Sequence, residues 1–540
     1  MRYIYFLFLF CAISAQSQTN GYYFVAFKNK ANNTFSLSSP SAFLSQRSID
    51  RRTRQQIALD SLDLPVSQTY LNQLTQMGLS IHSVSKWLNG AIIIVNETSQ
   101  YTSLSALPFV KSIKYVRPLL AKKTNNNKFD KDLKQYNYGT ATNQITMMNG
   151  QYLHNLGKKG DGMLIAVLDA GFMGVDTIRY FDSLRLQNRI YLTRDIVDGY
   201  NDNYVYESHP HGTMVLSTMA VLKNNEFVGT APKAAYALIR TEEGAHEYIF
   251  EEYAWVIGAE LADSIGADVI NSSLGYTTFD DSTMNHTWAD LNGKVAVSSI
   301  GATICSRKGM IVCVSAGNSG DDAWRKIGSP ADADSVLTVG AVDANRNYAF
   351  FSSQGYSSDG RVKPDVSAQG LSSAIIREDG TSTFGSGTSF SSPILCGLVT
   401  CLWQSQPQKN NIEIMDAVRK SASQYNTPDS LLGYGIPDFL QAYNLLAGIY
   451  NTNAENFRIK SLYPNPCSES TQLTYISDKV RILTILLFSN DGKLISEKKI
   501  ITKPYAIEHV NISTASLKKG LYLLQIKSDD INKTISFLKN

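Results

Sequence analysis

Three segments of this sequence carry side chains that can act together as a carboxylate, a base and a nucleophile. Asp169 ends the apolar run LIAVLD, His211 precedes the apolar stretch MVLSTMAV, and Ser389 precedes ILCGLVTCLW. A serine hydroxyl attacks well only when a base removes its proton, and a buried carboxylate holds imidazole in the tautomer that can do so. The three residue types, in the order Asp, His, Ser, therefore predict acyl transfer at Ser389.

The residues around Ser389 and Asn318 can supply what a developing oxyanion needs. Glycines precede Ser389 in GSGTSFSSP, and the helix expected after it offers main-chain N–H groups at its start. Asn318 ends MIVCVSAGN and can add a side-chain N–H. Taken singly, an Asp after a strand or a Gly-Thr-Ser string is usually only structural. Their occurrence together, at strand ends and helix starts, favours a catalytic site.

The elements that must position these residues lie in an expected domain over residues 140–448. Short apolar runs recur there, and helical stretches such as 248–265 lie between them. Apolar strands that alternate with helices predict a doubly wound, mostly parallel α/β sheet covered on both faces. Active sites in such sheets lie at the carboxyl ends of the strands. The runs are MLIAVLD, AAYALIR, DVINSSLG, MIVCVSAGN and VLTVGAVD.

A smaller unit is expected on each side of this domain. Residues 22–120 have four strand-like runs and three helical ones, which predicts a small α+β domain, and residues 121–139 read as an exposed, polar linker. Residues 455–540 alternate in hydropathy around an Asn-Asp-Gly turn at 490–492, which predicts about seven strands in an antiparallel β-sandwich. Residues 449–456 are expected to form a hinge before it.

The first 18 residues have the layout of a secretory signal peptide. A positive start is followed by ten apolar residues, Ile4 to Ile13, and then by small and polar residues. A membrane span needs roughly twenty apolar residues. We therefore expect export and no transmembrane segment in the mature chain. We also expect a monomer. The net charge of +3 in 540 residues gives no reason to expect nucleic acid as a partner.

Neither the cysteines nor the acidic loop DIVDGYND predicts a cofactor that the protein requires. Cys396 and Cys401 are typical of small core residues, and a bond between Cys305 and Cys313 stays open. With Cys467, five cysteines follow the signal segment, so at least one must be unpaired. The loop DIVDGYND has two interpretations, a structural calcium site or a solvated acidic loop; its acids are Asp195, Asp198 and Asp202.

These segments resemble the subtilisin-like serine proteases, or subtilases. IAVLDAGF is similar to the family's Asp motif, HGTMV to its His motif, GTSFSSP to its Gly-Thr-Ser-x-x-x-Pro motif and VSAGN to its oxyanion segment. The resemblance implies a secreted endopeptidase that hydrolyses peptide bonds in proteins or peptides through an acyl-enzyme. It implies that Asp169, His211 and Ser389 form the triad and that Asn318 binds the oxyanion.

The same resemblance implies the substrate cleft. NSSLG at 271–275 is similar to one wall of the family's cleft, and Gly328 in IGSP to the glycine at the floor of its specificity pocket. Asp438 departs from the usual ending of the fold's last helix. The residues implied for the cleft are Ser273, Leu274, Gly275, Ala316, Gly317 and Gly328.

The flanks resemble further parts of exported subtilases. Residues 22–120 have the order of a subtilase propeptide, with an unrelated binding domain as the alternative. The tail, with YPNP at 463–466 and GLYL at 520–523, is similar to the C-terminal sorting domains of type IX secretion, with a substrate-binding sandwich as the alternative. The resemblance implies the type IX machinery as a partner and export through the periplasm of a Gram-negative bacterium. A subtilase fold without activity, used for binding, is the other function considered.

Overall fold

The computed structural model describes residues 20–119, 139–199, 201–448, 457–477, 481–502 and 508–540. The predicted signal peptide, nearly all of the predicted linker and the predicted hinge lie outside these residues. The chain divides into two compact units, with the boundary in the sequence between Ala447 and Gly448.

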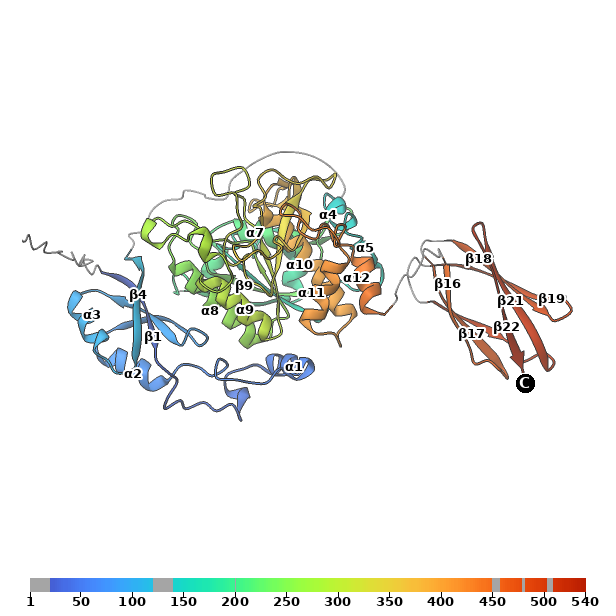
Figure 1. The fold of residues 1–540 in the computed structure, drawn as a ribbon, viewed down its shortest axis with the longest axis horizontal. Helices are drawn as coiled ribbons and strands as arrows, with labels where there is room; N and C mark the ends of the chain where they lie inside the picture. Colours follow the sequence, from blue (N-terminus) through green and yellow to red (C-terminus); the bar gives the residue numbers. More distant parts are fainter. Residues whose placement is uncertain (1–19, 120–138, 200, 449–456, 478–480, 503–507) are drawn as a thin grey trace, which may run out of the picture. The chain divides into compact units, whose positions relative to one another are not determined.

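A sheet of seven parallel strands is the centre of the first unit (Figure 1). The five apolar runs form β5, β9, β10, β11 and β12, so the predicted doubly wound sheet is confirmed. Two further strands of this sheet were not predicted: one is partly exposed, and the other is the short segment VSAQ, which has no long apolar run. The strands, in spatial order, are β13 (Val366–Gln369), β12 (Leu337–Val342), β11 (Ile311–Ser315), β10 (Val269–Ser272), β5 (Leu164–Asp169), β9 (Ala235–Arg240) and β6 (Ile190–Asp195).

The strand order reverses beside β5. From β5 the chain builds β6 and β9 on one side and then crosses to β10 and the strands beyond it on the other. Connections that leave in opposite directions open a crevice at the carboxyl ends of the strands. Asp169 ends β5, Ser273 follows β10 and Asn318 lies three residues after β11, so they reach the same edge.

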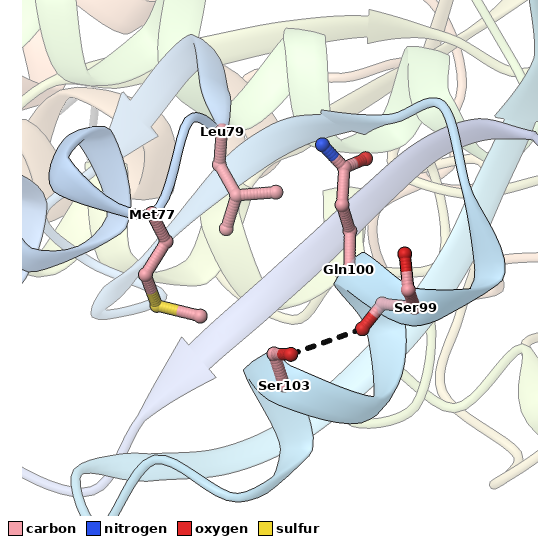
Figure 2. Close-up of a pocket in the computed structure, with 5 residues that line it drawn as sticks. All are labelled: Met77, Leu79, Ser99, Gln100 and Ser103. Atoms are coloured by element: carbon pink, nitrogen blue, oxygen red, sulfur yellow. Dashed lines mark hydrogen bonds between the residues drawn. The ribbon is translucent and has the colours of Figure 1, made fainter.

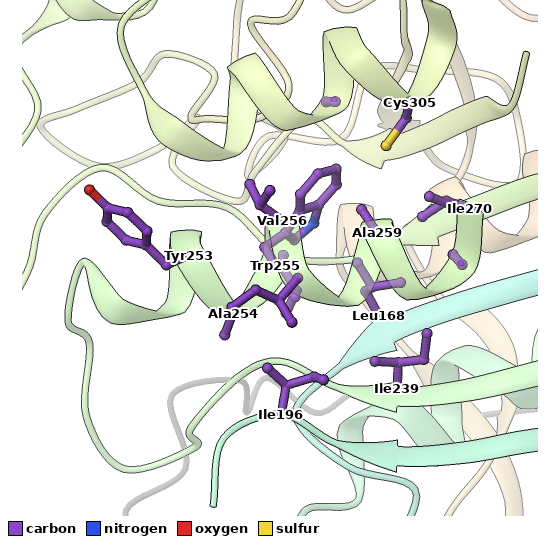
Figure 3. Packing of buried hydrophobic residues seen from close by; sticks show 14 of the residues in the cluster. Leu168, Ile196, Ile239, Tyr253, Ala254, Trp255, Val256, Ala259, Ile270 and Cys305 are labelled. Carbon is purple, nitrogen blue, oxygen red and sulfur yellow. The ribbon is translucent and has the colours of Figure 1, made fainter. Parts of the chain in front are cut away.

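Helices cover both faces of this sheet. α8 (Phe250–Ile265) and α9 (Val297–Arg307) pack on the face that Leu164, Ala166 and Leu168 share, and Figure 3 shows α8 side chains lying against Leu168, Ile239 and Ile270. Alternate strand residues point to the opposite face. There α7 (His211–Ala220) and α10 (Thr388–Ser405) contact the sheet.

The remaining elements of this domain are short. Asp438, which departs from the family pattern, caps α12: its carboxylate accepts a hydrogen bond from Gln441 N at 2.9 Å. The helices are α4 (Thr142–Thr146), α5 (Gln151–Asn155), α6 (Asp182–Leu186), α11 (Asn411–Lys420) and α12 (Phe439–Leu446), and the hairpins are β7 (Leu222–Lys223) with β8 (Phe227–Val228) and β14 (Ser373–Ile376) with β15 (Ser382–Gly385).

The N-terminal domain is the predicted small α+β unit. Its antiparallel strands follow the order β2 (Ser80–Ser85), β3 (Gly90–Val95), β1 (Gly21–Phe27) and β4 (Val110–Pro118). One face packs on α2 (Gln68–Gln76) and α3 (Thr98–Ser105). The other face packs on α8, where the rings of Phe24 and Tyr253 lie 4.5 Å apart between centroids.

A hollow on the N-terminal domain lies between the end of α2 and α3 (Figure 2). None of the predicted site residues lines it. Its lining residues are Met77, Leu79, Ser99, Gln100 and Ser103.

The second unit is the predicted antiparallel β-sandwich. One sheet has the order β16 (Phe457–Tyr463), β17 (Ser470–Ser477) and β20 (Glu508–Ser513). The other has the order β19 (Leu494–Ile501), β18 (Ile482–Ser489), β21 (Gly520–Ser528) and β22 (Ile531–Lys539). The turn at 490–492 joins β18 to β19, as predicted, and Gly492 adopts the positive φ that it requires.

Two further expectations concern a bond between Cys305 and Cys313 and a membrane-spanning helix. All five described cysteines are buried and free, so Cys305 and Cys313 are not bonded to each other. Among the helices that the structure describes, none combines the length and the hydropathy needed to cross a bilayer.

Candidate active site

Asp169 and His211 form a buried pair at the carboxyl edge of the sheet. Nδ1 of His211 lies 2.7 Å from Oδ1 of Asp169, and the two residues are 2% and 0% exposed. Oδ1 also accepts a hydrogen bond from Ala170 N at 2.8 Å. Because a carboxylate only accepts, Nδ1 carries the proton and donates it. This tautomer leaves a lone pair on Nε2, which is the state that a general base requires.

Glycines allow α7 to begin so close to the end of β5. A Cβ on Gly212 would lie 2.3 Å from the carbonyl oxygen of Gly171 and 3.0 Å from Cβ of Asp169. A side chain at position 212 would therefore push His211 away from Asp169. The Gly in HGTMV is thus required by packing.

Ser389 is the second residue of α10 and lies against the end of β10. Its hydroxyl donates to the carbonyl oxygen of Ser273 at 3.4 Å, and the Ser273 hydroxyl donates to the carbonyl of Ser389 at 2.9 Å. The next residue, Phe390, has its ring centroid 6.5 Å from that of His211. The start of α10 is therefore held beside the Asp169–His211 pair.

Asn318 reaches the same helix start from β11. Its Oδ1 accepts hydrogen bonds from Thr388 N at 2.8 Å and from Thr388 Oγ1 at 2.9 Å. Because a main-chain N–H donates to this atom, it must be the amide oxygen, and the amide nitrogen takes the other position. A Cβ on Gly387 would lie 3.6 Å from that nitrogen, so Asn318 presents its donor beside the glycine that precedes α10.

The six predicted cleft residues come together around the ends of β10 and β11. Ser273, Leu274 and Ala316 are buried, whereas Gly275 is exposed and Gly317 has a φ of 103°. The Ser315 hydroxyl donates to the Leu274 carbonyl at 3.4 Å, which joins the two segments.

A main-chain bridge brings Gly328 to the same segments. Tyr276 N donates to Ser329 O at 2.8 Å, and Ser329 N donates to Tyr276 O at 3.1 Å. A Cβ on Gly328 would lie 3.2 Å from the Tyr276 carbonyl, so only a glycine fits without displacement.

A cluster of three glutamates next to the cleft escaped the sequence analysis. Carboxylate oxygens of Glu242, Glu247 and Glu251 lie within 4.8 Å of one another, and the Tyr276 hydroxyl donates to Glu242 at 3.1 Å. Burial, and then these negative charges, raise the pKa of Tyr276 well above its usual value. Oxygen ligands of this kind suit a hard cation such as Ca²⁺. In the sequence the only sign of this cluster is the acid-rich string TEEGAHEYIFEE at 241–252. The fold shows which of its acids converge.

The acids of the loop at 195–202, for which a calcium site or a solvated loop was expected, are paired with arginines. Arg240 Nη1 lies 3.1 Å from Asp195 Oδ2 and 2.7 Å from Asp198 Oδ2, and Arg194 pairs with Asp202 at 3.0 Å. Burial raises the pKa of Asp195, which Arg240 opposes. Arg240 thus compensates the charges of Asp195 and Asp198 without a bound cation.

Comparisons with protein families match three parts of the chain. Residues 160–435 match the subtilase family (peptidase S8). Residues 22–131 match the peptidase S8 propeptide domain of Bacteroidota, and residues 461–540 match the secretion system C-terminal sorting domain.

Individual proteins similar to this chain are bacterial proteases. Subtilisin E of Bacillus subtilis (strain 168) is 30% identical over 282 residues, which are 52% of this chain and 65% of that protein. Subtilisin of Bacillus pumilus is 30% identical over the same length, which is 90% of that protein. The match thus spans just under two thirds of subtilisin E. The solved structure of the epidermin leader peptide processing serine protease of Staphylococcus aureus shares the fold, with a TM-score of 0.54 and 18% identity over 81% of this chain and 100% of that chain.

Proposed function

The chain belongs to the subtilase family (peptidase S8), and on this premise we propose that it is a secreted serine endopeptidase made as an inactive precursor. The observation that carries the proposal is the buried Asp169–His211 hydrogen bond of 2.7 Å beside the start of α10, where Ser389 lies. A buried imidazole in this tautomer has no packing role that an apolar side chain would not fill better. Next to a serine at a helix N-terminus it is a general base.

In the proposed mechanism Ser389 is the nucleophile. Its Oγ attacks the carbonyl carbon of the scissile peptide bond while Nε2 of His211 takes the hydroxyl proton. Asp169 stabilises the imidazolium that forms, and His211 then gives the proton to the leaving amine. Water, activated by His211, hydrolyses the acyl-enzyme and frees Ser389. Apart from water and the substrate, every group in these steps belongs to the chain, so the proposed chemistry calls for no cofactor.

Asn318 is the proposed side-chain donor to the oxyanion. Its oxygen is held by Thr388, so its amide nitrogen is oriented without reorganisation when negative charge develops on the substrate oxygen. The start of α10 adds the positive end of a helix dipole. These two features stabilise the transition state more than the bound substrate.

Protein and peptide chains are the proposed substrates. Ser273 to Gly275 and Ala316 to Gly317 follow the neighbouring strands β10 and β11, and Gly275 is exposed without a side chain. An extended peptide can pair with such a main-chain edge. Gly328 would then leave space for the side chain that precedes the cut bond.

The flanking parts support synthesis as a precursor and export. The N-terminal domain, matched by the S8 propeptide family, packs on α8, and we propose that it is removed by cleavage of the chain between it and the catalytic domain. The C-terminal sandwich is matched by a sorting-domain family, and we propose that the type IX machinery recognises it and carries the protein to the surface or medium of its host.

A serine-directed fluorophosphonate probe tests this function. The purified chain should be labelled on Ser389, and Ser389→Ala and His211→Ala should both lose the label. Cleavage of a protein substrate should disappear in the same two variants. A folded chain that takes no label would instead be a subtilase fold used for binding.

A further inference from the structure

The segment between β1 and α2 is not part of the N-terminal sheet. These residues, 29–66, contain α1 (Gln46–Gln55) and are called the arm here. The arm makes its own contacts with the catalytic domain, separate from the face of the sheet that packs on α8.

α1 docks against the C-terminal ends of two helices of the catalytic domain. The carbonyl groups there have no partner within their own helix and form the negative end of the helix dipole. Four arm residues donate to them: Ser45 N to Ser264 O at 2.9 Å, Arg47 Nε to Gly266 O at 2.8 Å, Arg51 Nε to Lys308 O at 3.2 Å and Gln55 Nε2 to Gly309 O at 2.7 Å. The arm thus caps both α8 and α9.

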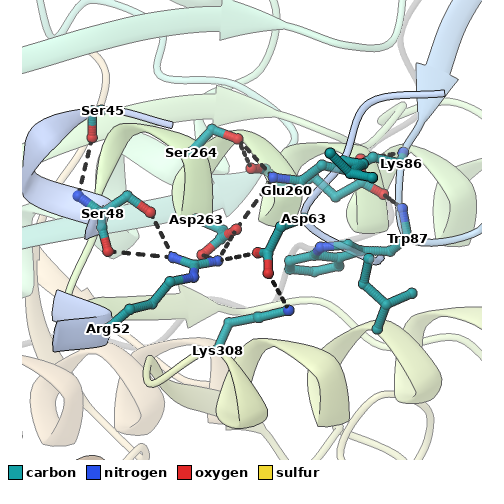
Figure 4. A network of polar contacts seen from close by, with 12 residues as sticks. Ser45, Ser48, Arg52, Asp63, Lys86, Trp87, Glu260, Asp263, Ser264 and Lys308 are labelled. Atoms are coloured by element: carbon teal, nitrogen blue, oxygen red, sulfur yellow. Dashed lines mark hydrogen bonds and ion pairs between the residues drawn. The ribbon is translucent and has the colours of Figure 1, made fainter. Parts of the chain in front are cut away.

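Asp263 of α8 is buried among positive charges of the N-terminal domain. It is 0% exposed, bonds to Arg51, and lies 2.9 Å from Arg52 and 3.2 Å from Lys86 (Figure 4). Burial alone would raise the pKa of Asp263, but the charges of Lys86, Arg51 and Arg52 outweigh it and hold the pKa well below its usual range. Asp263 is therefore a buried carboxylate that the N-terminal domain neutralises.

Lys308, beyond the end of α9, shows the opposite arrangement. It is 2% exposed, and its Nζ lies 2.9 Å from both Asp60 and Asp63 of the arm. Charges thus cross the interface in both directions, and Asp63 also pairs with Arg52 at 2.6 Å. Such reciprocal pairing fixes one register of the arm on this surface.

Two glycines shape the surface for the arm. A Cβ on Gly266 would lie 2.7 Å from Cβ of Arg47, and one on Gly309 would lie 2.7 Å from Cδ1 of Ile57. Both glycines have positive φ and end their helices. The catalytic domain therefore presents a close-fitting site for an arginine-rich helix.

We propose that the arm is a second anchor, whose contacts set how fast the N-terminal domain leaves the catalytic domain once the chain between them has been cut. Departure of the arm breaks its ion pairs to Asp263 and Lys308 and its hydrogen bonds at the ends of α8 and α9 at once. Removing Arg51 and Arg52 by substitution, while the arm stays docked, leaves Asp263 buried without these two partners, which is strongly unfavourable. Weakening the arm should therefore speed release of the N-terminal domain. This does not depend on which enzyme makes the cut.

A cleavable precursor tests the anchor. The full chain carries Ser389→Ala and a recognition sequence for a site-specific protease within residues 121–137, and it is cut after folding. Native mass spectrometry then follows departure of the N-terminal domain. We expect it to stay bound when the arm is intact, and Arg51→Ala with Arg52→Ala to speed its departure about 100-fold.

The control removes two positive charges elsewhere in the same domain. Lys28 donates to Pro108 within this domain and Lys111 is exposed on β4, so Lys28→Ala with Lys111→Ala should not change the rate. If the double arginine variant does not fold, Arg54→Ala with Gln55→Ala decides, because these positions lie at the rim of the arm. In that variant the N-terminal domain should depart about tenfold faster than it does with an unmodified arm. Two results would overturn the proposal: immediate release of an N-terminal domain whose arm is intact, or equal departure rates for the arm variants and the control variant.

Discussion

Nδ1 of His211 lies 2.7 Å from Oδ1 of Asp169, although the two residues are 42 positions apart in the chain. They meet because β5 ends, and α7 begins, at the same edge of the sheet, and because Gly212 admits the close approach. The donor is Nδ1, so the carboxylate decides which ring nitrogen is free to act.

Asp169→Asn should lower kcat/KM by about 10⁴-fold, since an amide at this position favours the wrong imidazole tautomer. The shape of the site should persist, so thermal unfolding should change little. Steady-state kinetics on a peptide substrate, beside a melting curve, makes the comparison. Activity within tenfold of the parent would show that His211 does not depend on Asp169.

Asn318→Ala should lower kcat by about 10²–10³-fold with little change in KM, because the lost donor acts on the transition state. That magnitude comes from the same position type in subtilisin. Asn318→Asp is the matched variant, since it keeps an oxygen for Thr388 but replaces the N–H by a carboxylate oxygen. It should be impaired at least as much as Asn318→Ala, because its negative charge faces the developing oxyanion. A raised KM with normal kcat would show that Asn318 only shapes the cleft.

Two groups in the interface of the N-terminal domain should respond to pH in opposite directions. Burial raises the pKa of Glu260 to about 7, although Ser85, Lys86 and Trp87 donate to its carboxylate. Burial, and then the charge of Arg117, lower the pKa of His82 to about 4. Lys30 also faces Glu260, and Asp198 also faces His82, but Lys30 has a pKa of about 8 and stays charged below neutrality.

The sign of each effect follows from the released state. Glu260 strengthens association below its ordinary pKa, and this gain is lost as the pH rises through 7. His82 favours association above its ordinary pKa, and this gain is lost as the pH falls toward 4. Each variant removes one of the two groups and leaves the other to titrate. In the cleaved precursor, Glu260→Gln leaves His82, so the N-terminal domain should depart about tenfold faster at pH 5 than at pH 7. His82→Gln leaves Glu260, so departure should be about tenfold slower at pH 5 than at pH 7. Parallel pH profiles for the two variants would contradict this assignment.

Deleting residues 455–540 should leave a recombinant enzyme that matures and cleaves a peptide. The sandwich has its own buried core and contributes none of the candidate site residues. In the host the same deletion should hold the protein in the periplasm, as fractionation and immunoblotting would show. Failure to mature in vitro would place the sandwich within the catalytic fold. Normal export of the truncated chain would favour a substrate-binding role for the tail.

The sequence was sufficient for the strands that are wholly apolar and for the chemistry at their ends. β5, β9, β10, β11 and β12 are buried on both faces, so hydropathy alone reveals them. Asp169 ends such a strand and Asn318 follows another, so they must meet at one edge, whereas His211 and Ser389 were proposed from the helix starts at which they lie. β6 was missed because it is partly exposed and polar.

Only the tertiary structure decided how charges far apart in the chain are paired. Arg51 and Asp263 are separated by 212 positions, and Asp63 and Lys308 by 245. In the sequence these four residues look like ordinary charged residues of helices and turns, since a charge carries no sign of its burial or of its partner. The same holds for Glu242, Glu247 and Glu251, whose convergence depends on the turn between β9 and α8. Hydropathy patterns report whether a residue faces the core, whereas electrostatic pairing depends on distances that folding alone creates.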